Sequence, residues 1–424
     1  MRILVVGNGG REHAIIKAVK KNEKVSKIYA VKGNGGIASD AECVNIDVKD
    51  IDAIACFAVE NKIDFAIVAP DDPLVLGAVD KLEQKGIKCF GPEKKAAIIE
   101  GSKVFSKNLM KKYGIPTASY ETFSDLEKAI AYLETAPIPT VIKADGLALG
   151  KGVIIAETRD DAILAVKEMM QDKIFGESGS NVVIEEFLTG PEVSVLAFTD
   201  GKTVKPMVSS MDHKRALDGD KGLNTGGMGT IAPNPYYTEE IAKECMEKIF
   251  IPTMNAMNSE DRTFKGCLYF GLMLTPNGPK VIEYNCRFGD PETQVVLPLL
   301  ESDLLEIMMA VRDGKLSETE VKFSNASACC VVLASNGYPQ KYNSGFQITL
   351  PNTSEKEEIY IAGAKIENGN LLTSGGRVLG AVATGNTLKE AVDHAYLLAG
   401  KIKFENAYMR KDIGAKALKV TEDK

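Results

Sequence analysis

Short apolar runs alternate with amphipathic stretches along the first hundred residues. The apolar runs predict strands at Arg2–Val6, Lys27–Val31, Phe65–Ala69 and Lys88–Phe90, and Glu12–Lys20 has the pattern of a helix. Strands that alternate with helices in this way predict a doubly wound parallel sheet of the α/β class. Ligands of such sheets bind at the carboxyl ends of the strands, so we expect a site there.

The pattern changes after Gly91-Pro92, and we place a domain boundary near residue 100. Residues 101–325 mix helical and β-hairpin patterns, including a helix at Ser102–Tyr113 and a strand at Thr140–Lys143. Residues 326–424 predict a small β-rich domain, so the whole chain is expected to be an α/β and α+β multidomain protein. The strands and the helix expected in this last part are Ala328–Ala334, Phe346–Leu350, Ile359–Ala362, Arg377–Thr384 and Leu388–Ile402.

Composition narrows the class of protein. The 424 residues are 45% hydrophobic and 26% charged, which is typical of a soluble enzyme with a substantial core. The net charge of −7 argues against binding nucleic acid through a cationic face. The longest apolar runs are far shorter than the roughly 18 residues of a membrane span, and the opening residues carry no readable secretory signal. We therefore expect a cytoplasmic protein without a nucleic-acid or membrane partner.

Cysteine and histidine usage disfavours both disulfides and zinc. The eight cysteines form no C-x-x-C pair and lie mostly in apolar runs, which indicates buried thiols in a reducing compartment. The three histidines are not spaced as a pair of metal ligands.

Two glycine-rich segments suggest contacts with phosphate. Gly7–Glu12 follows a predicted strand and precedes a predicted helix, so its amides suit an anion at the helix N-terminus. Its closing glutamate and the basic end of the second strand disfavour NAD, and a tight turn without a ligand explains the segment equally well. Asp145–Gly152 separates two predicted strands, which indicates a hairpin lid over a polyphosphate with Lys143 and Lys151 as point charges. A solvated hairpin is the alternative.

Two further segments carry charge beside turns. Glu185 ends one predicted strand and Glu192 begins the next, and both suit the hydroxyl and amino groups of an adenosine, although solvated strand-end charges are the simpler explanation. Residues 212–229 combine opposite charges with glycines in what reads as one long loop region without core-forming residues. Polar loops of this length are usually functional or disordered, and interleaved charges suit a zwitterionic or phosphorylated small substrate.

The segment Lys280–Asp290 indicates a metal site. Glu283 and Asn285 lie two apart on a predicted strand, so their side chains share a face, and Arg287 continues the row if the strand persists. Carboxylate and amide oxygens are hard ligands suited to magnesium, which keeps water and substrate phosphates as its other ligands. An exposed edge strand is the alternative.

Taken in order, these segments resemble the ATP-grasp superfamily and, within it, the glycinamide ribonucleotide synthetase (phosphoribosylamine–glycine ligase) family. The resemblance covers the whole chain and rests on five blocks of sequence. They are Gly7–His13, Asp212–Arg215, Asp218–Gly222, Asn224–Gly229 and Asn285–Glu292.

The resemblance implies a fold and an activity. It implies a Rossmann-like N-terminal domain at 1–100, an ATP-grasp domain at 101–325 with a mobile lid at about 120–190, and a C-terminal domain at 326–424. The implied reaction joins glycine to 5-phosphoribosylamine in de novo purine biosynthesis, converting ATP to ADP and phosphate through glycyl phosphate. The implied cofactors are ATP and Mg²⁺ or Mn²⁺, and the protein is expected to be a monomer or weak homo-oligomer.

The resemblance also implies roles for residues. Arg287, Lys143 and Lys151 would be catalytic, and Glu283 and Asn285 would hold the metal. The residues expected to bind the nucleotide are Lys103, Lys143, Gly150, Lys151, Gly152, Glu185, Glu186, Phe187, Leu188 and Glu192. Those expected to bind the amino sugar phosphate and glycine are Gly9, Gly10, Asp71, Asp212, Lys214, Arg215, Asp218, Asn224, Thr225, Gly226, Arg287 and Asp290.

Two departures from the family pattern and two other functions remain open. Asp71 stands where the family usually has Glu, and Leu268–Met273 has no second metal carboxylate. An ATP-grasp carboxylase or formyl-phosphate-using transferase would share the lid and the metal strand, but residues 212–229 argue against it. A nucleotide-sensing module without turnover is disfavoured by the joint presence of lysines, metal ligands and Arg287.

Overall fold

The computed structural model describes residues 1–147, 152–174 and 176–422. Its N-terminal part contains a parallel five-stranded sheet in the order β3-β2-β1-β4-β5, as the alternating pattern predicts. The strands are β1 (Arg2–Gly7), β2 (Lys27–Lys32), β3 (Glu42–Val44), β4 (Phe65–Val68) and β5 (Lys88–Phe90). Sequence analysis missed β3, because this short edge strand is largely exposed and lacks an apolar run.

Helices cover both faces of this sheet. Alternate residues of β1 enter two different hydrophobic cores, Leu4 and Val6 on one face and Ile3 and Val5 on the other, and all four are fully buried. The helices are α1 (Gly10–Val19), α2 (Ile51–Glu60), α3 (Asp71–Leu76), α4 (Ala78–Gln84) and α5 (Lys94–Gly101). The strand order reverses between β1 and β4, so the turns that follow these two strands flank the crevice where such sheets bind ligands.

The middle of the chain forms two antiparallel sheets. One has the order β11-β10-β16-β17, and the other, the lid sheet, has the order β6-β9-β7-β8. The first consists of β10 (Glu192–Thr199), β11 (Val204–Pro206), β16 (Gly266–Thr275) and β17 (Gly278–Asn285). The lid sheet consists of β6 (Tyr120–Phe123), β7 (Thr140–Ala144), β8 (Val153–Ala156) and β9 (Val182–Glu186).

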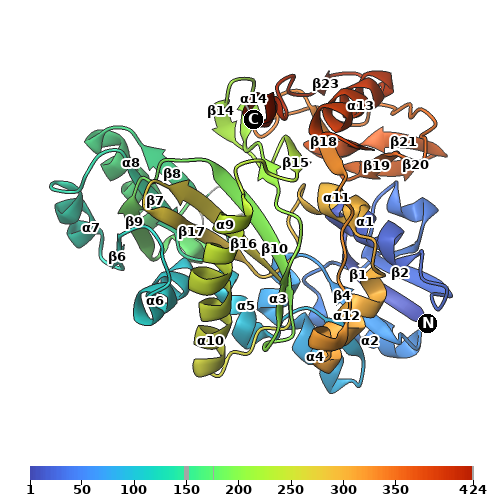
Figure 1. Ribbon diagram of the computed structural model, residues 1–424, viewed down its shortest axis with the longest axis horizontal. Coiled ribbons are helices and arrows are strands. Elements are labelled where there is room, and N and C mark those ends of the chain that lie inside the picture. Colours follow the sequence, from blue (N-terminus) through green and yellow to red (C-terminus); the bar gives the residue numbers. More distant parts are fainter. Residues whose placement is uncertain (148–151, 175, 423–424) are drawn as a thin grey trace.

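The lid sheet has helices of its own and projects from the rest of the molecule (Figure 1). Helices α7 (Leu126–Leu133) and α8 (Arg159–Met170) pack on it around a separate small core. The predicted helix at 102–113 is α6 (Lys103–Tyr113), which connects the N-terminal part to the lid. The predicted hairpin is confirmed, because β7 and β8 pair in antiparallel register.

An antiparallel sheet contains most of the strands near the C-terminus. It has the order β12-β15-β18-β22-β19, and β23 pairs with β18. Its strands are β12 (Met211–Asp212), β15 (Gly229–Ala232), β18 (Ser327–Ser335), β19 (Glu357–Ile361), β22 (Arg377–Gly385) and β23 (Ala407–Tyr408). Helix α13 (Leu388–Lys401), close to the predicted 388–402, packs against it. Strands β12 and β15 thus join a sheet whose other members follow residue 326; the boundary near 325 stays a prediction.

Two sequence-based expectations need correction in this region. The expected strand Phe346–Leu350 is absent from the described structure, where Gln347 and Thr349 each make a single isolated bridge, to Leu372 and Lys403. The expected long loop at 212–229 instead contains the hairpin of β13 (Arg215–Leu217) and β14 (Lys221–Asn224), and Met228 in it is fully buried.

Candidate active site

Strand β17 carries the two oxygen ligands predicted for a metal. Tyr284 lies between them in sequence and is only 3% exposed, in the core. Glu283 and Asn285 are half-buried and therefore project from the other face of the strand. The predicted sharing of one face by these two side chains agrees with the geometry.

A β-bulge precedes Glu283. In the pairing of β16 with β17, Gly271 lies opposite Glu283 while Leu272 lies opposite Val281, which leaves Ile282 as the extra residue. The Ile282 carbonyl oxygen accepts a hydrogen bond of 3.0 Å from Lys143 Nζ. The bulge therefore joins a lysine of the lid sheet to the strand that carries Glu283.

Glu185 lies between two lysines. Its carboxylate forms ion pairs with Lys143 and Lys107, and all three side chains are almost completely buried. Lys107 also donates to Thr117 Oγ1 at 2.8 Å, and burial, opposed by Glu185, lowers the pKa of Lys107 to about 8. In this structure the Glu185 carboxylate holds Lys143, and its role toward adenosine stays a prediction. Sequence analysis did not single out Lys107.

Four cationic side chains surround the Glu283 carboxylate. Lys214 Nζ lies 3.9 Å from Glu283 Oε1. Burial alone raises the pKa of Glu283, but the charges of Lys214, Lys143, Lys103 and Arg287 outweigh burial, and the net shift is downward. Glu283 is therefore held ionised. Lysine and arginine side chains at such a position suit phosphate groups.

Lys214 connects Glu283 to the strand-start acid Glu192. Its Nζ lies 3.1 Å from Glu192 Oε2, and Glu192, with Glu283, raises the pKa of Lys214 well above its usual value. The predicted nucleotide acid and the predicted metal ligand thus share one lysine, which was assigned from the sequence to substrate binding.

The loop after β7 is tied to the start of α6. Asp145 Oδ1 accepts hydrogen bonds from Ser102 Oγ at 2.9 Å and from the Val104 amide at 3.1 Å, and Lys103 Nζ donates to the Gly146 carbonyl at 2.7 Å. Burial, opposed by Glu283, lowers the pKa of Lys103. These contacts bring Lys103 to the mouth of the predicted lid loop.

The tip of that loop is only partly described. Gly150 and Lys151, predicted from the sequence to bind nucleotide, lie outside the described residues. Gly152 is described, and its carbonyl oxygen accepts a hydrogen bond of 2.9 Å from the Ala144 amide, which continues the hairpin.

Arg287 is held by a buried carboxylate that sequence analysis missed. Glu100, at the end of α5, lies 3.0 Å from Arg287 Nη2 and accepts a hydrogen bond of 2.7 Å from the Cys286 amide. The same Nη2 donates to Asn285 Oδ1 at 3.2 Å and lies 3.9 Å from Asp71 Oδ2. Arg287 Nε is buried without a partner in the described structure. Arg287 therefore joins strand β17 to Asp71, which follows β4 where the strand order of the N-terminal sheet reverses.

The turn at Gly9 and Gly10 is closed by its own glutamate. Glu12 Oε2 accepts a hydrogen bond of 2.6 Å from the Gly9 amide, and a Cβ on Gly9 would lie 2.8 Å from that oxygen. Glu12 also pairs with Arg11 at 2.6 Å. The Gly9 amide is therefore satisfied internally, which favours the tight-turn interpretation of this segment.

The glycine turn faces Asp290, which pairs with an arginine that the sequence did not point to. A Cβ on Gly9 would lie 3.1 Å from Asp290 Oδ2. Arg377 Nη1 lies 3.2 Å from Asp290 Oδ1 and donates to the Gly226 carbonyl at 2.8 Å. Gly226 and Asp290, both predicted to bind substrate, are thus brought together, by an arginine with no motif around it.

Asp212 is half-buried and lies near the buried Glu292 carboxylate. Burial and the charge of Glu292 raise the pKa of Asp212 well above its usual value, with Lys214 and Arg377 opposing. Ser194 Oγ lies 3.4 Å from Glu292 Oε1 and 2.8 Å from the Tyr269 hydroxyl. Polar side chains from β10, β12 and β16 therefore meet beside Lys214.

Four other predicted substrate residues lie on the β13–β14 hairpin. Arg215 pairs with Asn224, and Thr225 Oγ1 donates to the Lys214 carbonyl at 2.9 Å. Asp218 accepts a hydrogen bond of 2.8 Å from the Lys411 amide. The structure thus joins Asn224 and Thr225 to the hairpin stem, but directs Asp218 to the C-terminal segment.

The remaining predicted nucleotide residues follow β9. Glu186 lies 2.8 Å from Lys280 Nζ and accepts from Ser119 Oγ at 2.9 Å. Phe187 is exposed and Leu188 is half-buried. They lie next to the Glu185–Lys143 pair, and their contacts with a nucleotide stay predictions.

Sequence comparisons agree with this arrangement. Family profiles for phosphoribosylglycinamide synthetase match its N domain at residues 1–100, its ATP-grasp (A) domain at 101–293 and its C domain at 328–416. The phosphoribosylamine–glycine ligase of Caldanaerobacter subterraneus is 49% identical over 415 residues, covering 98% of this chain and all of that protein.

The chain belongs to the phosphoribosylamine–glycine ligase family. It is an ATP-grasp ligase, as the resemblance predicts. The crystal structure of the phosphoribosylamine–glycine ligase from Thermotoga maritima is 34% identical and matches 97% of this chain and all of that one with a TM-score of 0.87. The predicted fold class is confirmed.

A more distant structure shares the fold alone. The biotin carboxylase domain of the Hydrogenobacter thermophilus 2-oxoglutarate carboxylase, solved with MgADP and bicarbonate, has a TM-score of 0.74 at 16% identity. The two alignments cover 96% of this chain and 91% of that one. Members of the phosphoribosylamine–glycine ligase family therefore share the ATP-grasp architecture with enzymes of other substrates, and residues decide the function.

The donor set around β17 fits a divalent cation that takes further ligands from a nucleotide. Within the described residues, no three His, Cys, Asp or Glu side chains cluster so as to hold a metal by themselves. Glu283 and Asn285 carry two oxygen donors beside several cationic side chains, and magnesium commonly completes its shell with phosphates and water.

None of the helices among the described residues combines the length and apolar character of a membrane span.

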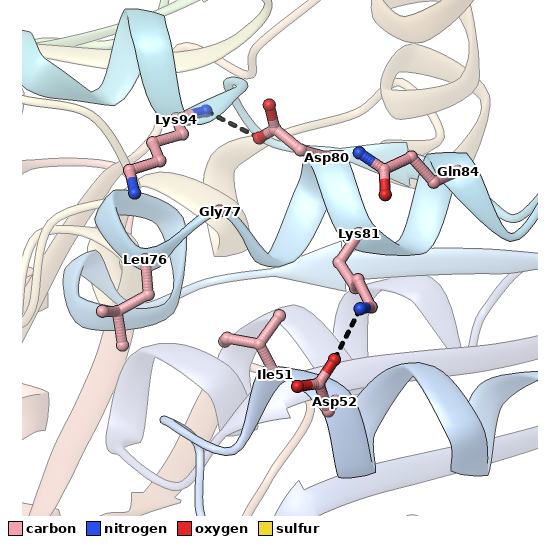
Figure 2. Close-up of a pocket in the computed structure, with 8 residues that line it drawn as sticks. All are labelled: Ile51, Asp52, Leu76, Gly77, Asp80, Lys81, Gln84 and Lys94. Atoms are coloured by element: carbon pink, nitrogen blue, oxygen red, sulfur yellow. Dashed lines mark hydrogen bonds and ion pairs between the residues drawn. The ribbon is translucent and has the colours of Figure 1, made fainter.

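A surface depression lies apart from the site described above. It has a volume of about 300 Å³ and is lined by residues of α2 to α5 and the turns beside them (Figure 2). An ion pair of 2.6 Å between Lys81 and Asp52 crosses it, and the residues described above are not among its lining.

Proposed function

We propose that this chain joins glycine to 5-phosphoribosylamine, giving glycinamide ribonucleotide, ADP and phosphate in de novo purine biosynthesis. The observation that carries this proposal is the position of Glu283 and Asn285 among Lys103, Lys143, Lys214 and Arg287. Relatives named phosphoribosylamine–glycine ligase, aligned over nearly the whole chain, support the choice of substrates.

We propose Mg²⁺, or Mn²⁺ in its place, as the cation held by Glu283 and Asn285. When bound, such a cation neutralises phosphate charge and orients the transferring phosphoryl group. The lysines around Glu283 are suited to contact the oxygens of a triphosphate.

The side chains of this chain act by positioning and by charge. Glu185 and the Ile282 carbonyl hold the ammonium group of Lys143, which would contact the phosphates of ATP. Lys103 does the same from the start of α6, under the predicted lid loop. Arg287, fixed by Glu100, stabilises negative charge on the transferring group or on the substrate phosphate.

The proposed mechanism needs no nucleophile from the protein, because both nucleophiles belong to the substrates. A carboxylate is a poor electrophile, so the glycine carboxylate first attacks the γ-phosphorus, and ADP leaves. The amine of phosphoribosylamine then attacks the carbonyl carbon of glycyl phosphate and expels inorganic phosphate. Phosphoryl transfer of this kind depends on alignment and charge neutralisation. Exclusion of water by the lid would protect the acyl phosphate.

The proposed setting follows from the same substrates. We place the ligase in the cytoplasm, as a monomer or weak homo-oligomer that acts on small molecules. Six of the eight cysteines are buried and all are free, which suits a reducing compartment.

An assay of ADP release tests the substrate assignment. ADP should appear only when ATP, glycine and freshly prepared phosphoribosylamine are all present. Bicarbonate or formate should not replace glycine. Turnover with either of these would favour the carboxylase or formyl-phosphate alternative, and ATP binding without turnover would favour a nucleotide sensor.

A further inference from the structure

The β13–β14 hairpin is held to the C-terminal segment 408–416 by hydrogen bonds at strand β13 and at the tip of the hairpin. The Tyr408 hydroxyl donates to the Ala216 carbonyl at 2.9 Å, and the Lys411 amide donates to Asp218 at 2.8 Å. The Gly219 amide donates to Asp412 Oδ2 at 2.8 Å. In Figure 1, β14 accordingly lies beside α14 (Ala415–Glu422).

Arg410 is the centre of this contact. Its side chain is only 1% exposed, yet the guanidinium satisfies three different groups. Nη1 donates to the Arg215 carbonyl at 3.0 Å, Nη2 lies 2.9 Å from Asp220 Oδ1, and Nε lies 2.8 Å from Asp412 Oδ1. A buried guanidinium with this many charge-assisted bonds fixes geometry, because each bond constrains the same rigid plane.

His213 extends the contact to the base of the hairpin. The Gly414 amide donates to His213 Nε2 at 3.1 Å, and His213 Nδ1 lies 3.2 Å from the Gly229 carbonyl. This pattern requires the proton on Nδ1, so a neutral, buried imidazole joins the C-terminal segment to β15.

The residues next to these anchors face the proposed substrate site. Asp212 precedes His213 and lies in the field of Glu292, and Lys214 follows it and pairs with Glu192 and Glu283. At the other end of the hairpin, the Gly226 carbonyl accepts from Arg377. Any movement of the hairpin would therefore displace Asp212 and Lys214.

We propose that Arg410 is a positioning residue for acceptor binding: through the segment 408–416 it holds the β13–β14 hairpin so that Asp212 and Lys214 meet glycine and the amino sugar phosphate. The inference rests on the proposed function for its substrates. It also gives Asp218 a role different from the substrate contact predicted from the sequence, since Asp218 belongs to the anchored tip.

Steady-state kinetics of Arg410→Met in the full-length chain test this. We expect KM for glycine and for phosphoribosylamine to rise at least tenfold, whereas KM for ATP stays within about twofold of wild type. Arg410→Lys, which retains the charge, should recover part of the loss. Asp393→Asn is the matched control, because it removes an exposed ion pair of 2.9 Å with Lys389 on α13; all its constants should match wild type.

Hydrogen–deuterium exchange provides a measurement independent of turnover. In Arg410→Met, the amides of 214–224 should exchange faster while those of β16 and β17 stay as in wild type. If Arg410→Met fails to fold, Asp412→Ala, which removes one partner of Arg410 and of the Gly219 amide, replaces it in both experiments.

Three outcomes separate the proposals. Unchanged acceptor KM values, or equal losses for all three substrates, would overturn the positioning role. Unchanged exchange at 214–224 would do so as well. A wild-type chain that releases no ADP with glycine and phosphoribosylamine would refute the proposed function, while the exchange experiment would still decide whether Arg410 holds the hairpin.

Discussion

Glu283 carries its negative charge among four cationic side chains, which makes it the residue of the site whose loss has the clearest chemical consequence. Replacing it by alanine leaves Lys103, Lys143, Lys214 and Arg287 without their shared counter-charge and removes one of the two proposed metal donors. It does not touch the core, because the side chain projects away from Tyr284.

We predict that Glu283→Ala lowers glycine-dependent ADP release at least a hundredfold while its Tm stays within a few degrees of wild type. Coupled ADP assays and thermal melts measure the two quantities. Glu247→Ala, on an exposed helix face, is the control and should behave as wild type. Near-normal turnover in Glu283→Ala would refute the metal assignment.

Glu100 should matter through Arg287. Glu100→Gln keeps the shape of the side chain but weakens the pair at 3.0 Å that orients the guanidinium. We expect kcat to fall about tenfold or more with a smaller change in KM for ATP, because a misaligned Arg287 affects charge that develops during transfer. Glu93→Gln, an exposed acid before the same helix, should leave kcat unchanged. An unaltered kcat in Glu100→Gln would show that Arg287 does not depend on this carboxylate.

Single-residue roles were the least predictable from the sequence. Glu283, Asn285 and Arg287 stand in a dense motif, and the period of a strand was enough to place the first two on one face. Glu100, Lys107, Arg377 and Arg410 lie outside the recognisable motifs, in stretches where a charge normally marks a solvated surface. Their surroundings are formed by segments that are distant in sequence; Glu100 and Cys286, for example, are separated by 186 positions. Hydrophobic patterning does not report such contacts.

At the level of elements, apolar periodicity located the strands that build the core and failed at the margins. Strands β1, β4, β7, β18 and β22 have long buried runs and were predicted. Strand β3 and the β13–β14 hairpin are short and polar, so their strand structure depends on pairing partners rather than on their own composition. The prediction for Phe346–Leu350 failed for the opposite reason. This segment has the alternating pattern of a strand, but it forms only isolated bridges to other segments.

The lid loop provides an element-level prediction. Asp145→Ala removes the acceptor of two hydrogen bonds from the start of α6 and should loosen the loop that is predicted to cover the nucleotide. We expect KM for ATP to rise about fivefold or more, as measured by initial rates.

A helix cap in the same lid is the matched control for that variant. Asp125→Ala removes the side chain that caps α7 and accepts from the Lys128 amide. It should cost about 1 kcal/mol of stability and leave KM for ATP unaltered. Equal KM values in the two variants would argue against a role of Asp145 in closing the loop.

At the scale of the whole molecule, His213 connects the hairpin to the C-terminal part and should make the stability of the fold depend on pH. Burial, then the charge of Arg410, lowers the pKa of His213 to about 4, and the Gly229 carbonyl, Asp220 and Asp412 oppose this shift. An unfolded histidine titrates near about 6.5. Between these two pH values, His213 is protonated in the unfolded chain and neutral in the folded chain. The contribution of neutral His213 to the free energy of unfolding is therefore complete above pH about 6.5 and is lost as the pH falls toward 4.

Thermal melts at pH 7 and pH 5 check this. The free energy of unfolding of the wild type should be about 2 kcal/mol lower at pH 5 than at pH 7 because of His213. His213→Gln should lack that part of the pH dependence. His394→Gln changes an exposed histidine on α13 and should retain it. The same pH dependence in wild type and His213→Gln would contradict the buried, neutral state of His213.

The central claim for the whole enzyme is that the acid group of glycine is activated by phosphorylation. The most direct measurement starts from glycine labelled with oxygen-18 in its carboxylate and follows the label by mass spectrometry of the inorganic phosphate. The proposed mechanism predicts that one labelled oxygen passes to each phosphate released. Phosphate that contains no label, in a reaction that still forms glycinamide ribonucleotide, would contradict it.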